Sequence, residues 1–444
     1  MSDVLIVGAG SAGSILAEHL SADPSCHVMV LESGPGDAAA LHLTADATVL
    51  PIGRDSPVAQ HYRTTLTENP RRDVDIVRGH CVGGSGAVNG GYFRLPVPAD
   101  FDPLPGWSWP EVEAHIRDIL AVIPVRHAHE FAGATDQFVA AARDCGYGWL
   151  SDLELADTIA GVGRLPLNIV DGARAGPAAA FLTPALGRPN LSLQTGTRVT
   201  RVRIAGGAAV GVEAIGPAGP VRIDADRVLL CAGAIASAQL LMLSGIGPAA
   251  DLAAVGIATV ADLPVGQRTW DHPELVMATG WAEDPGHPVL EAVLMVDGLE
   301  IRPYTTGFGS ASPNIGVALM APRSHGRVSL ASADPSASPR IEHRYDSEPA
   351  DVAALQRGCD RVGDLLDGIT ALGPPQWSTS QHLCGTAPMG LDDDEHSVVD
   401  PQCRVRGVAG LWVVDGSVLP RIPGSGPHAT IAVIAHRAAE FLRR

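Results

Sequence analysis

Three glycines near the start of the chain are spaced as a dinucleotide-binding loop requires. The segment VGAGSAG places Gly8, Gly10 and Gly13 in the pattern G-x-G-x-x-G, directly after an apolar run. Such glycines allow a tight turn and a close approach of the backbone to a pyrophosphate. Glu32, at the end of the next apolar run, can accept hydrogen bonds from a ribose and disfavours the 2′-phosphate of NADP. The pattern therefore predicts bound FAD or NAD, and it does not separate the two.

This loop requires a strand before it and a helix after it. Residues 4–9 predict a buried parallel strand, residues 14–21 predict a helix, and residues 26–32 predict a second strand that ends at the carboxylate. The N-terminus of that helix would stabilise the negative charge of the pyrophosphate. The C-terminal stretch has the same order of elements: a strand that ends at Asp415, a Gly-rich connection and an apolar helix that starts near His428. Together these elements predict an α/β unit of the Rossmann type.

A second glycine cluster, RGHCVGGSGAVNGGYFRLP at residues 78–96, has few bulky side chains. A flat ligand could lie close against such a backbone. Residues 191–230 predict a run of strands with hairpin turns, and residues 231–248 predict a Gly turn, a buried helix and a Gly-Pro stop. The stretch at 272–395 is richer in Pro, His and Asp. We interpret it as part of a second domain, with strand candidates at 289–296 and 308–320.

Composition limits the partners and the compartment. The 444 residues carry a formal net charge of −18, which disfavours binding to nucleic acid or to an anionic lipid surface. Seven scattered cysteines without a C-x-x-C pair predict reduced thiols in the cytoplasm, with neither a disulfide framework nor a zinc site. Residues 228–250 are uncharged and long enough to span a membrane. Their glycines, serines and proline favour a strand, a turn and a buried helix instead, so no transmembrane segment is expected.

Several of these motifs together resemble the glucose-methanol-choline (GMC) family of flavin oxidoreductases. The matching segments run through most of the chain: VGAGSAG with Glu32, RGHCVGGSGAVNGGYF, GWSW, GAIASAQLLMLSGIGP, DLPVGQRTWDHP, GRVSLASADPSASPRIEHRY, QHLCGTAPMG and LWVVDGSVLPRIPGSGPHATIAVIAHRAA. The resemblance implies FAD rather than NAD. It also implies a Rossmann-like α/β FAD-binding domain and a discontinuous α+β substrate domain built on an antiparallel sheet. The expected FAD-binding domain comprises 1–105, 185–271 and 396–444, and the substrate-binding domain comprises 106–184 and 272–395.

The resemblance also assigns roles to single residues. His382 matches the catalytic base of the family, and His428 matches its partner, which is His or Asn in other members. The residues expected to bind FAD are Gly8, Gly10, Ser11, Ala12, Gly13, Glu32, Gly83, Gly84, Ser85, Asn89, Gly90, Val199, Asp415, Gly416, His428 and Ala429. Some relatives carry a flavin-linking histidine in the early glycine loop, where this chain has Ala87, Val88 and Asn89. We therefore expect FAD to be bound without a covalent link.

These assignments imply the oxidation of an alcohol. A neutral imidazole at His382 can take the hydroxyl proton while a hydride passes to flavin N5, and His428 would hold the hydroxyl oxygen. The segment WDHP, with Asp271 and His272, is expected to order the domain junction.

Two motifs, at 77–94 and 230–247, are most similar to those of actinobacterial enzymes associated with the redox cofactor mycofactocin. They imply a mycofactocinol dehydrogenase that passes electrons to a respiratory acceptor, in the cytoplasm or peripherally at the inner face of the membrane. An alcohol oxidase that forms hydrogen peroxide and a flavin-containing hydroxynitrile lyase are the alternatives.

Overall fold

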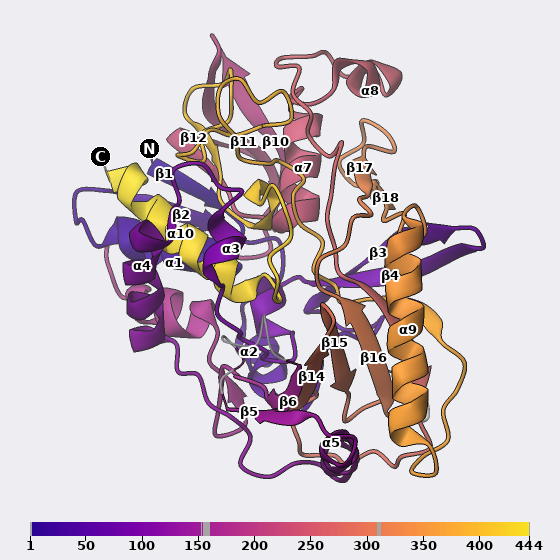
Figure 1. Ribbon diagram of the computed structural model, residues 1–444. Coiled ribbons are helices and arrows are strands. Elements are labelled where there is room, and N and C mark those ends of the chain that lie inside the picture. Colours follow the sequence, from indigo (N-terminus) through magenta and orange to yellow (C-terminus); the bar gives the residue numbers. More distant parts are fainter. Residues whose placement is uncertain (1, 152, 154–159, 309–311, 444) are drawn as a thin grey trace.

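The computed structural model describes residues 2–151, 153, 160–308 and 312–443. Two large sheets, each with its own helices, lie one above the other (Figure 1). The chain starts and ends beside the upper sheet in this view, so its last helix returns to the first strand.

The upper sheet is the predicted nucleotide-binding sheet. Its parallel part has the order β9-β2-β1-β12-β20, and two antiparallel strands extend it from the first half of β12. The strands are β1 (Ser2–Val7), β2 (Val28–Leu31), β9 (Leu191–Gln194), β10 (Arg198–Ala205), β11 (Ala208–Gly216), β12 (Gly219–Leu230) and β20 (Leu411–Val413). Val4, Leu5 and Ile6 of β1 are fully buried, as expected for a central strand covered on both faces.

Three helices pack together beside this sheet: α1 (Ser11–Ser21), α4 (Trp109–Val122) and α10 (His428–Arg443). Helix α4 starts with a capping box between Ser108 and Glu111. Its buried side chains Val112, Ile116 and Ile119 belong to the core of the upper sheet, although the domain boundaries expected from the sequence place residues 106–184 in the second domain. Those boundaries remain a proposal.

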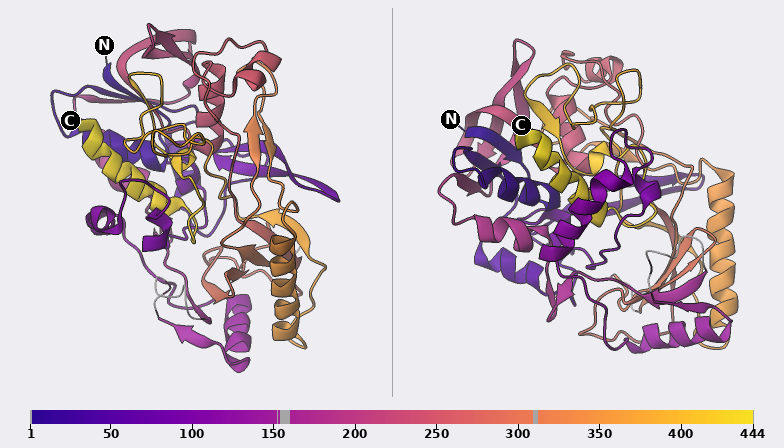
Figure 2. Two further views of the ribbon diagram at one scale, coloured as in Figure 1. Left: turned by 45° about the horizontal axis from the view of Figure 1, so that its top comes forward. Right: turned by 60° about the vertical axis from the view of Figure 1, so that its left-hand side comes forward.

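The lower sheet has the order β19-β13-β16-β15-β14-β6-β5, and every neighbouring pair is antiparallel except β5 and β6. Its strands are β5 (Gly148–Leu150), β6 (Gly161–Arg164), β13 (Pro273–Ala278), β14 (Ala292–Val296), β15 (Leu299–Pro303), β16 (Asn314–Leu319) and β19 (Gln376–Thr379). Helices α5 (Gly133–Asp144) and α9 (Pro349–Leu366) pack against it, and Figure 2 shows α9 along the sheet from two further sides. The strands predicted at 289–296 and 308–320 correspond to β14 and β16, and residues 309–311 lie outside the described residues.

A smaller sheet connects these units, with the order β17-β18-β3-β4. It is formed by β3 (Ala59–Glu68), β4 (Arg71–Gly79), β17 (Arg327–Ser329) and β18 (Arg340–Glu342). The remaining elements are short: α2 (Ala38–Ala45), η1 (Gly84–Ala87), α3 (Pro98–Phe101), β7 (Ile169–Val170), β8 (Ala173–Arg174), η3 (Ala178–Leu182), α6 (Thr183–Ala185), α7 (Gly233–Leu243), α8 (Ala249–Ala254) and η4 (Gly416–Val418).

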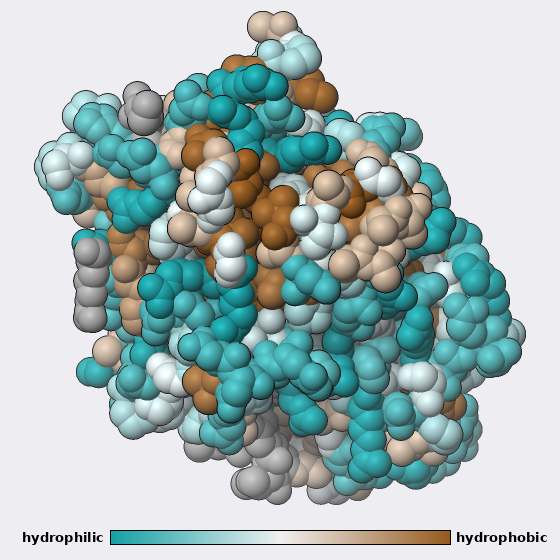
Figure 3. Space-filling model, turned by 90° about the horizontal axis from the view of Figure 1, so that it is seen from above, coloured by the Kyte–Doolittle hydropathy of each residue, from teal (hydrophilic) through white to brown (hydrophobic). Residues whose placement is uncertain are grey.

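The predicted fold class is confirmed: a Rossmann-like α/β unit is combined with a second, mainly antiparallel sheet built from separate stretches of chain. The uncharged stretch at 228–250 forms the end of β12, a turn and α7. Within the described chain, no helix has the length and apolar character needed to cross a membrane. Seen from above, the molecule carries apolar side chains among hydrophilic ones (Figure 3). The exposed apolar residues of the antiparallel strands in the upper sheet include Ile215 in β11 and Val221 in β12.

Candidate active site

The two predicted glycine clusters lie against each other. The N–H of Gly83 donates to the carbonyl of Ala9 over 2.8 Å, and a Cβ on Gly84 would lie 2.9 Å from the Cα of Gly10. We call the two loops, residues 7–13 and 83–91, together with His428 the cofactor cradle. Its two halves can approach this closely only because glycines face each other at the contact.

The first loop also needs its glycines for its own turn. Gly8 has φ +104°, and a Cβ there would lie 2.6 Å from the carbonyl oxygen of Cys231. A Cβ on Gly13 would lie 2.0 Å from the carbonyl oxygen of Gly8. Helix α1 starts at Ser11, so its N-terminus is available to an anionic group at the loop.

A cavity adjoins the first loop, and two of the residues expected to bind FAD line it. Gly8 and Val199 line it, together with Leu31, Ser33, Arg198 and the segment 335–338. Glu32 lies between Leu31 and Ser33, where its carboxylate accepts the N–H of Ala9 over 2.9 Å and that of Gly34 over 2.8 Å. Burial raises the pKa of Glu32. This carboxylate therefore connects the first turn to the end of β2 at the edge of the cavity.

The other expected cofactor residues occupy more varied surroundings. Asp415 is buried and accepts hydrogen bonds from the N–H of Gly233, the hydroxyl of Ser237 and the N–H of Ser417. Burial raises the pKa of Asp415. The remaining expected residues are Gly416, which faces Ile431; Gly90, which faces Val289 and Leu290; Ser85, which is exposed; and Ala12 and Ala429, whose side chains belong to the core.

Orphaned polar atoms lie in and near this region, and they fit a polar ligand. The hydroxyls of Ser417 and Thr430 are fully buried and have no hydrogen-bond partner in the described part of the chain. The same holds for both amide atoms of Asn168, which stands beside Gly91 and Gly176. Buried polar atoms without partners are costly, so these three residues fit a bound group that supplies the missing hydrogen bonds. No sequence motif singled out Asn168.

His428 belongs to the cofactor cradle. Its Nε2 lies 2.9 Å from the hydroxyl of Ser11, and its Nδ1 lies 3.2 Å from the amide nitrogen of Asn89. A Cβ on Gly86 would lie 2.8 Å from the same Nε2. Burial lowers the pKa of His428 to about 4, which keeps the ring neutral at pH 7. The structure thus brings His428 together with two residues expected to bind the cofactor.

His382 lies in a different environment, the one next to WDHP. Its Nδ1 is 2.8 Å from Nδ1 of His272, and a Cβ on Gly426 would lie 3.3 Å from its Nε2. Burial, with contributions from His272, Arg302 and Arg78, holds the pKa of His382 well below its usual value. The sequence paired His382 with His428. In the structure each histidine has its own partners. The residue that approaches His382 from the loop between η4 and α10 is Gly426.

Asp271 holds this second environment together. One carboxylate oxygen accepts the backbone N–H groups of His272 and His382, each over 2.8 Å. The other accepts the hydroxyls of Tyr345 over 2.9 Å and Thr379 over 2.8 Å. The Nδ1 of His343 lies 3.4 Å from the same oxygen of Asp271. We call this group the junction: Asp271, His272, His343, Tyr345, Thr379 and His382. These contacts accord with the expected ordering role of Asp271 and His272, and the contact between the two imidazoles was not foreseen.

Buried charges continue from the junction into the lower sheet. Arg302 binds Glu300 over 2.7 Å and donates to the hydroxyl of Ser380 over 3.0 Å, and that hydroxyl donates to Glu274 over 3.0 Å. All three charged groups are almost fully buried. Sequence reasoning did not identify them, and the only signal is the presence of charged residues inside otherwise apolar strands.

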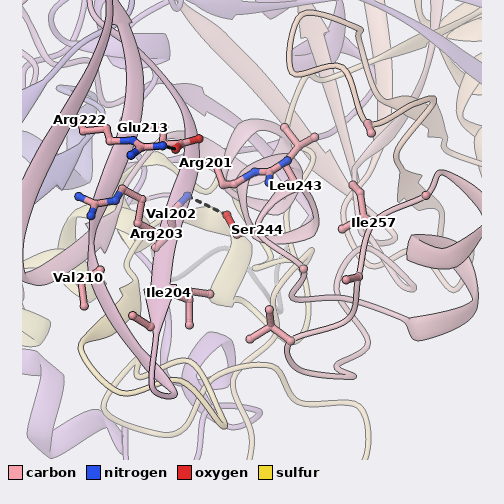
Figure 4. Close-up of a pocket in the computed structure, with 16 residues that line it drawn as sticks. Arg201, Val202, Arg203, Ile204, Val210, Glu213, Arg222, Leu243, Ser244 and Ile257 are labelled. Atoms are coloured by element: carbon pink, nitrogen blue, oxygen red, sulfur yellow. Dashed lines mark hydrogen bonds and ion pairs between the residues drawn. The ribbon is translucent and has the colours of Figure 1, made fainter.

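A larger cavity lies elsewhere. It has a volume of about 530 Å³ and is lined from β10–β12 by Arg201, Arg203, Glu213 and Arg222, and from α7 and the loop after α8 by Leu243 and Ile257 (Figure 4). None of the expected site residues lines it. The cofactor cradle and the junction are therefore the candidate site. Within the described residues, no group of three or more His, Cys, Asp or Glu side chains is arranged to hold a metal ion.

Comparisons with known proteins match one family along nearly the whole chain. Two family models, both described as GMC oxidoreductase, match residues 2–274 and 322–435. A GMC-type oxidoreductase of Rhodococcus erythropolis, itself uncharacterised, is 39% identical over 489 positions, covering 99% of this chain and 98% of the relative. An oxygen-dependent choline dehydrogenase of Vibrio vulnificus is 28% identical, covering 99% of this chain and 94% of that one.

Solved structures of other enzymes share this fold over the whole chain. Pyridoxine 4-oxidase from Mesorbium loti aligns with a TM-score of 0.87 and 26% identity, covering 100% of this chain and 99% of that chain. A formate oxidase of Aspergillus oryzae, in a structure concerned with FAD modification, aligns with a TM-score of 0.88 and 22% identity, covering 100% and 98%.

Proposed function

The chain belongs to the GMC oxidoreductase family and is an oxidoreductase with FAD as its cofactor, and we propose that it oxidises the CH–OH group of an alcohol with His382 as the general base. The choline dehydrogenase and pyridoxine oxidase among its relatives support an alcohol substrate. When bound, FAD supplies the acceptor for the hydride.

The observation that carries this proposal is the environment of His382. Its Nδ1 is engaged by His272, while its Nε2 faces the backbone of Gly426 and has no hydrogen-bond partner among the described residues. A ring nitrogen that is held neutral and left without a protein partner can accept the hydroxyl proton of a substrate. The lowered pKa of His382 keeps the ring neutral at pH 7, so one of its two nitrogens is unprotonated.

The cofactor cradle would hold FAD without a covalent bond. The loops 7–13 and 83–91 would contact the pyrophosphate and the ring system, and the cavity beside Gly8 and Val199 would take the adenosine. The second loop offers Ala87, Val88 and Asn89 where a linking histidine would stand. The amide of Asn89 is engaged with His428, and neither of the other two has a nucleophilic side chain.

The finer proposal is a mycofactocinol dehydrogenase that passes electrons to a respiratory acceptor, acting in the cytoplasm or peripherally at the inner face of the membrane. It is supported by the resemblance of residues 77–94 and 230–247 to mycofactocin-associated enzymes. An oxygen-using alcohol oxidase is the second candidate, and the likeness to pyridoxine 4-oxidase favours it.

The test replaces His382 by Ala. The purified protein is mixed without oxygen with mycofactocinol and a panel of simple alcohols, and flavin absorbance is followed. The wild type should lose its flavin colour with at least one donor. His382→Ala should react about 10²- to 10⁴-fold more slowly, the usual contribution of a general base, while retaining FAD. His127→Ala, at an exposed histidine, is the matched control.

Admitting air then separates the two candidates. Loss of colour that persists in air supports a dehydrogenase, and rapid recovery with formation of peroxide supports the oxidase. If His382→Ala reduces its flavin as fast as the wild type, the assignment of the base is wrong. If no donor removes the colour, oxidation of these alcohols is wrong, and the lyase becomes the better hypothesis.

A further inference from the structure

The position of one proton in the junction can be deduced from the hydrogen bonds of His272. The ring is fully buried, and its Nε2 lies 3.1 Å from the carbonyl oxygen of Pro423. A carbonyl can only accept a hydrogen bond, so Nε2 of His272 carries a proton. The acceptor is itself fixed, because the N–H of Gly424 donates to Asp100 over 2.7 Å.

The second ring nitrogen of His272 follows from the first. Burial, with a contribution from Arg302, lowers the pKa of His272 to about 4, so the ring is neutral at pH 7. A neutral imidazole has one N–H, which leaves Nδ1 of His272 as an acceptor. The only donor that can satisfy the 2.8 Å contact between the two Nδ1 atoms is then the Nδ1–H of His382.

We propose that His272 is a positioning residue for the oxidation, because it holds His382 in the tautomer with a proton on Nδ1 and a free lone pair on Nε2. This lone pair faces Gly426, and the proposed function requires the substrate hydroxyl to approach it. The inference rests on the proposed function, in which His382 is the base. It adds the residue that decides which of the two ring nitrogens can act.

The proton balance is simple. The O–H bond of the substrate breaks, a new N–H bond forms at Nε2 of His382, and the electron pair stays on the substrate oxygen. His382 becomes an imidazolium whose Nδ1–H still donates to His272, so no proton has to pass to His272. A neutral acceptor therefore serves both protonation states of His382.

Asp271 does not accept the Nδ1–H of His382. Its oxygens accept the two backbone N–H groups and the hydroxyls of Tyr345 and Thr379, so it fixes the backbone on both sides of the pair. The arrangement differs from a triad in which a carboxylate orients the catalytic imidazole.

The decisive experiment reads the tautomers directly. The FAD-loaded protein is labelled with ¹⁵N at its histidine rings, and the ring signals at pH 7.5 are assigned with His382→Gln and His272→Gln. We expect His382 to show a protonated Nδ1 and an unprotonated Nε2, and His272 to show the reverse. A protonated Nε2 on His382 would overturn the inference, even if His382→Ala had shown that this residue is the base.

Two substitutions test the same point by rate. His272→Leu removes the acceptor, whereas the side-chain oxygen of His272→Asn can accept a hydrogen bond near the position of Nδ1. We expect His272→Leu to slow flavin reduction about 10- to 100-fold, as loss of an orienting partner does elsewhere, with FAD content unchanged, and His272→Asn to recover most of this loss. Equal losses in both variants, or no loss in His272→Leu, would contradict a positioning role. If His272→Leu does not fold, the tautomers of the wild type still decide.

Discussion

The cofactor cradle and the junction are built in different ways. The cradle depends on backbone groups: glycines at 8, 13 and 84 let the chain contact itself where no side chain would fit. The junction depends on buried side chains from distant segments, since Asp271 binds residues 74 to 111 positions away in the sequence. A site made of backbone responds to added volume, whereas a site made of buried imidazoles and a carboxylate responds to protons. The two can therefore be perturbed separately.

The largest effect should come from adding volume to the cradle. A methyl group at Gly13 would lie 2.0 Å from the carbonyl oxygen of Gly8, so Gly13→Ala must open the turn that precedes α1. We expect purified Gly13→Ala to contain almost no FAD, a loss of affinity of about 100-fold or more. The absorbance ratio of flavin to protein measures this directly.

The matched control for this change is Gly363→Ala. Gly363 lies inside α9, and nothing stands within 4 Å of its Cβ position. Alanine is favoured over glycine in a helix by about 1 kcal/mol, so this variant should keep full FAD content and equal or greater stability. A Gly13→Ala protein with normal FAD content would show that the tight turn is not what binds the cofactor.

A smaller effect should come from acid, to which the buried imidazoles of the junction contribute. Burial, with a contribution from Arg78 and against the opposite effect of Asp271, lowers the pKa of His343 to about 4. Burial also lowers the pKa of His272 to about 4. The unfolded chain takes up these protons near pH 6.5, so the stability that these neutral rings contribute is complete above pH 6.5 and is lost as the pH falls toward 4. For His343 this linkage predicts a loss of about 2 kcal/mol between pH 7.5 and pH 5.

Urea unfolding at the two pH values measures this loss. His343→Gln cannot titrate and should lose about 2 kcal/mol less stability than the wild type between pH 7.5 and 5, whereas His127→Gln, at an exposed site, should behave as the wild type does. Hydrogen exchange of the wild type should increase at pH 5 in 268–274 and 376–385. Equal acid sensitivity of His343→Gln and the wild type would contradict the neutral state assigned to His343.

The same contrast explains what could be predicted from the sequence. The cradle was predictable because its geometry is local: the strand, the glycine turn and the start of α1 are adjacent in the chain, and Glu32 comes directly after the next strand. The family resemblance assigned both glycine loops to FAD, but the contact between the loops was not predicted. The pairing of His272 with His382, which are 110 positions apart, leaves no periodic signal, because it depends on how β13 and β19 align. The buried Asn168 and Arg302 are equally invisible, since each is a single residue in an apolar or irregular stretch.

The smallest predicted effect concerns His428, where the sequence and the geometry suggest different roles. The sequence places it beside the substrate hydroxyl, but its ring contacts Ser11 and Asn89. If these contacts reflect its function, His428→Asn should weaken FAD binding about 10-fold, the effect of losing one or two hydrogen bonds, while flavin that remains bound is reduced within about threefold of the wild-type rate. Titration of the apoprotein with FAD and anaerobic reduction at saturating FAD separate the two quantities. A loss of reduction rate of 100-fold or more with unchanged FAD affinity would instead make His428 the catalytic partner of His382, and would mean that its ring leaves Ser11 when a substrate binds.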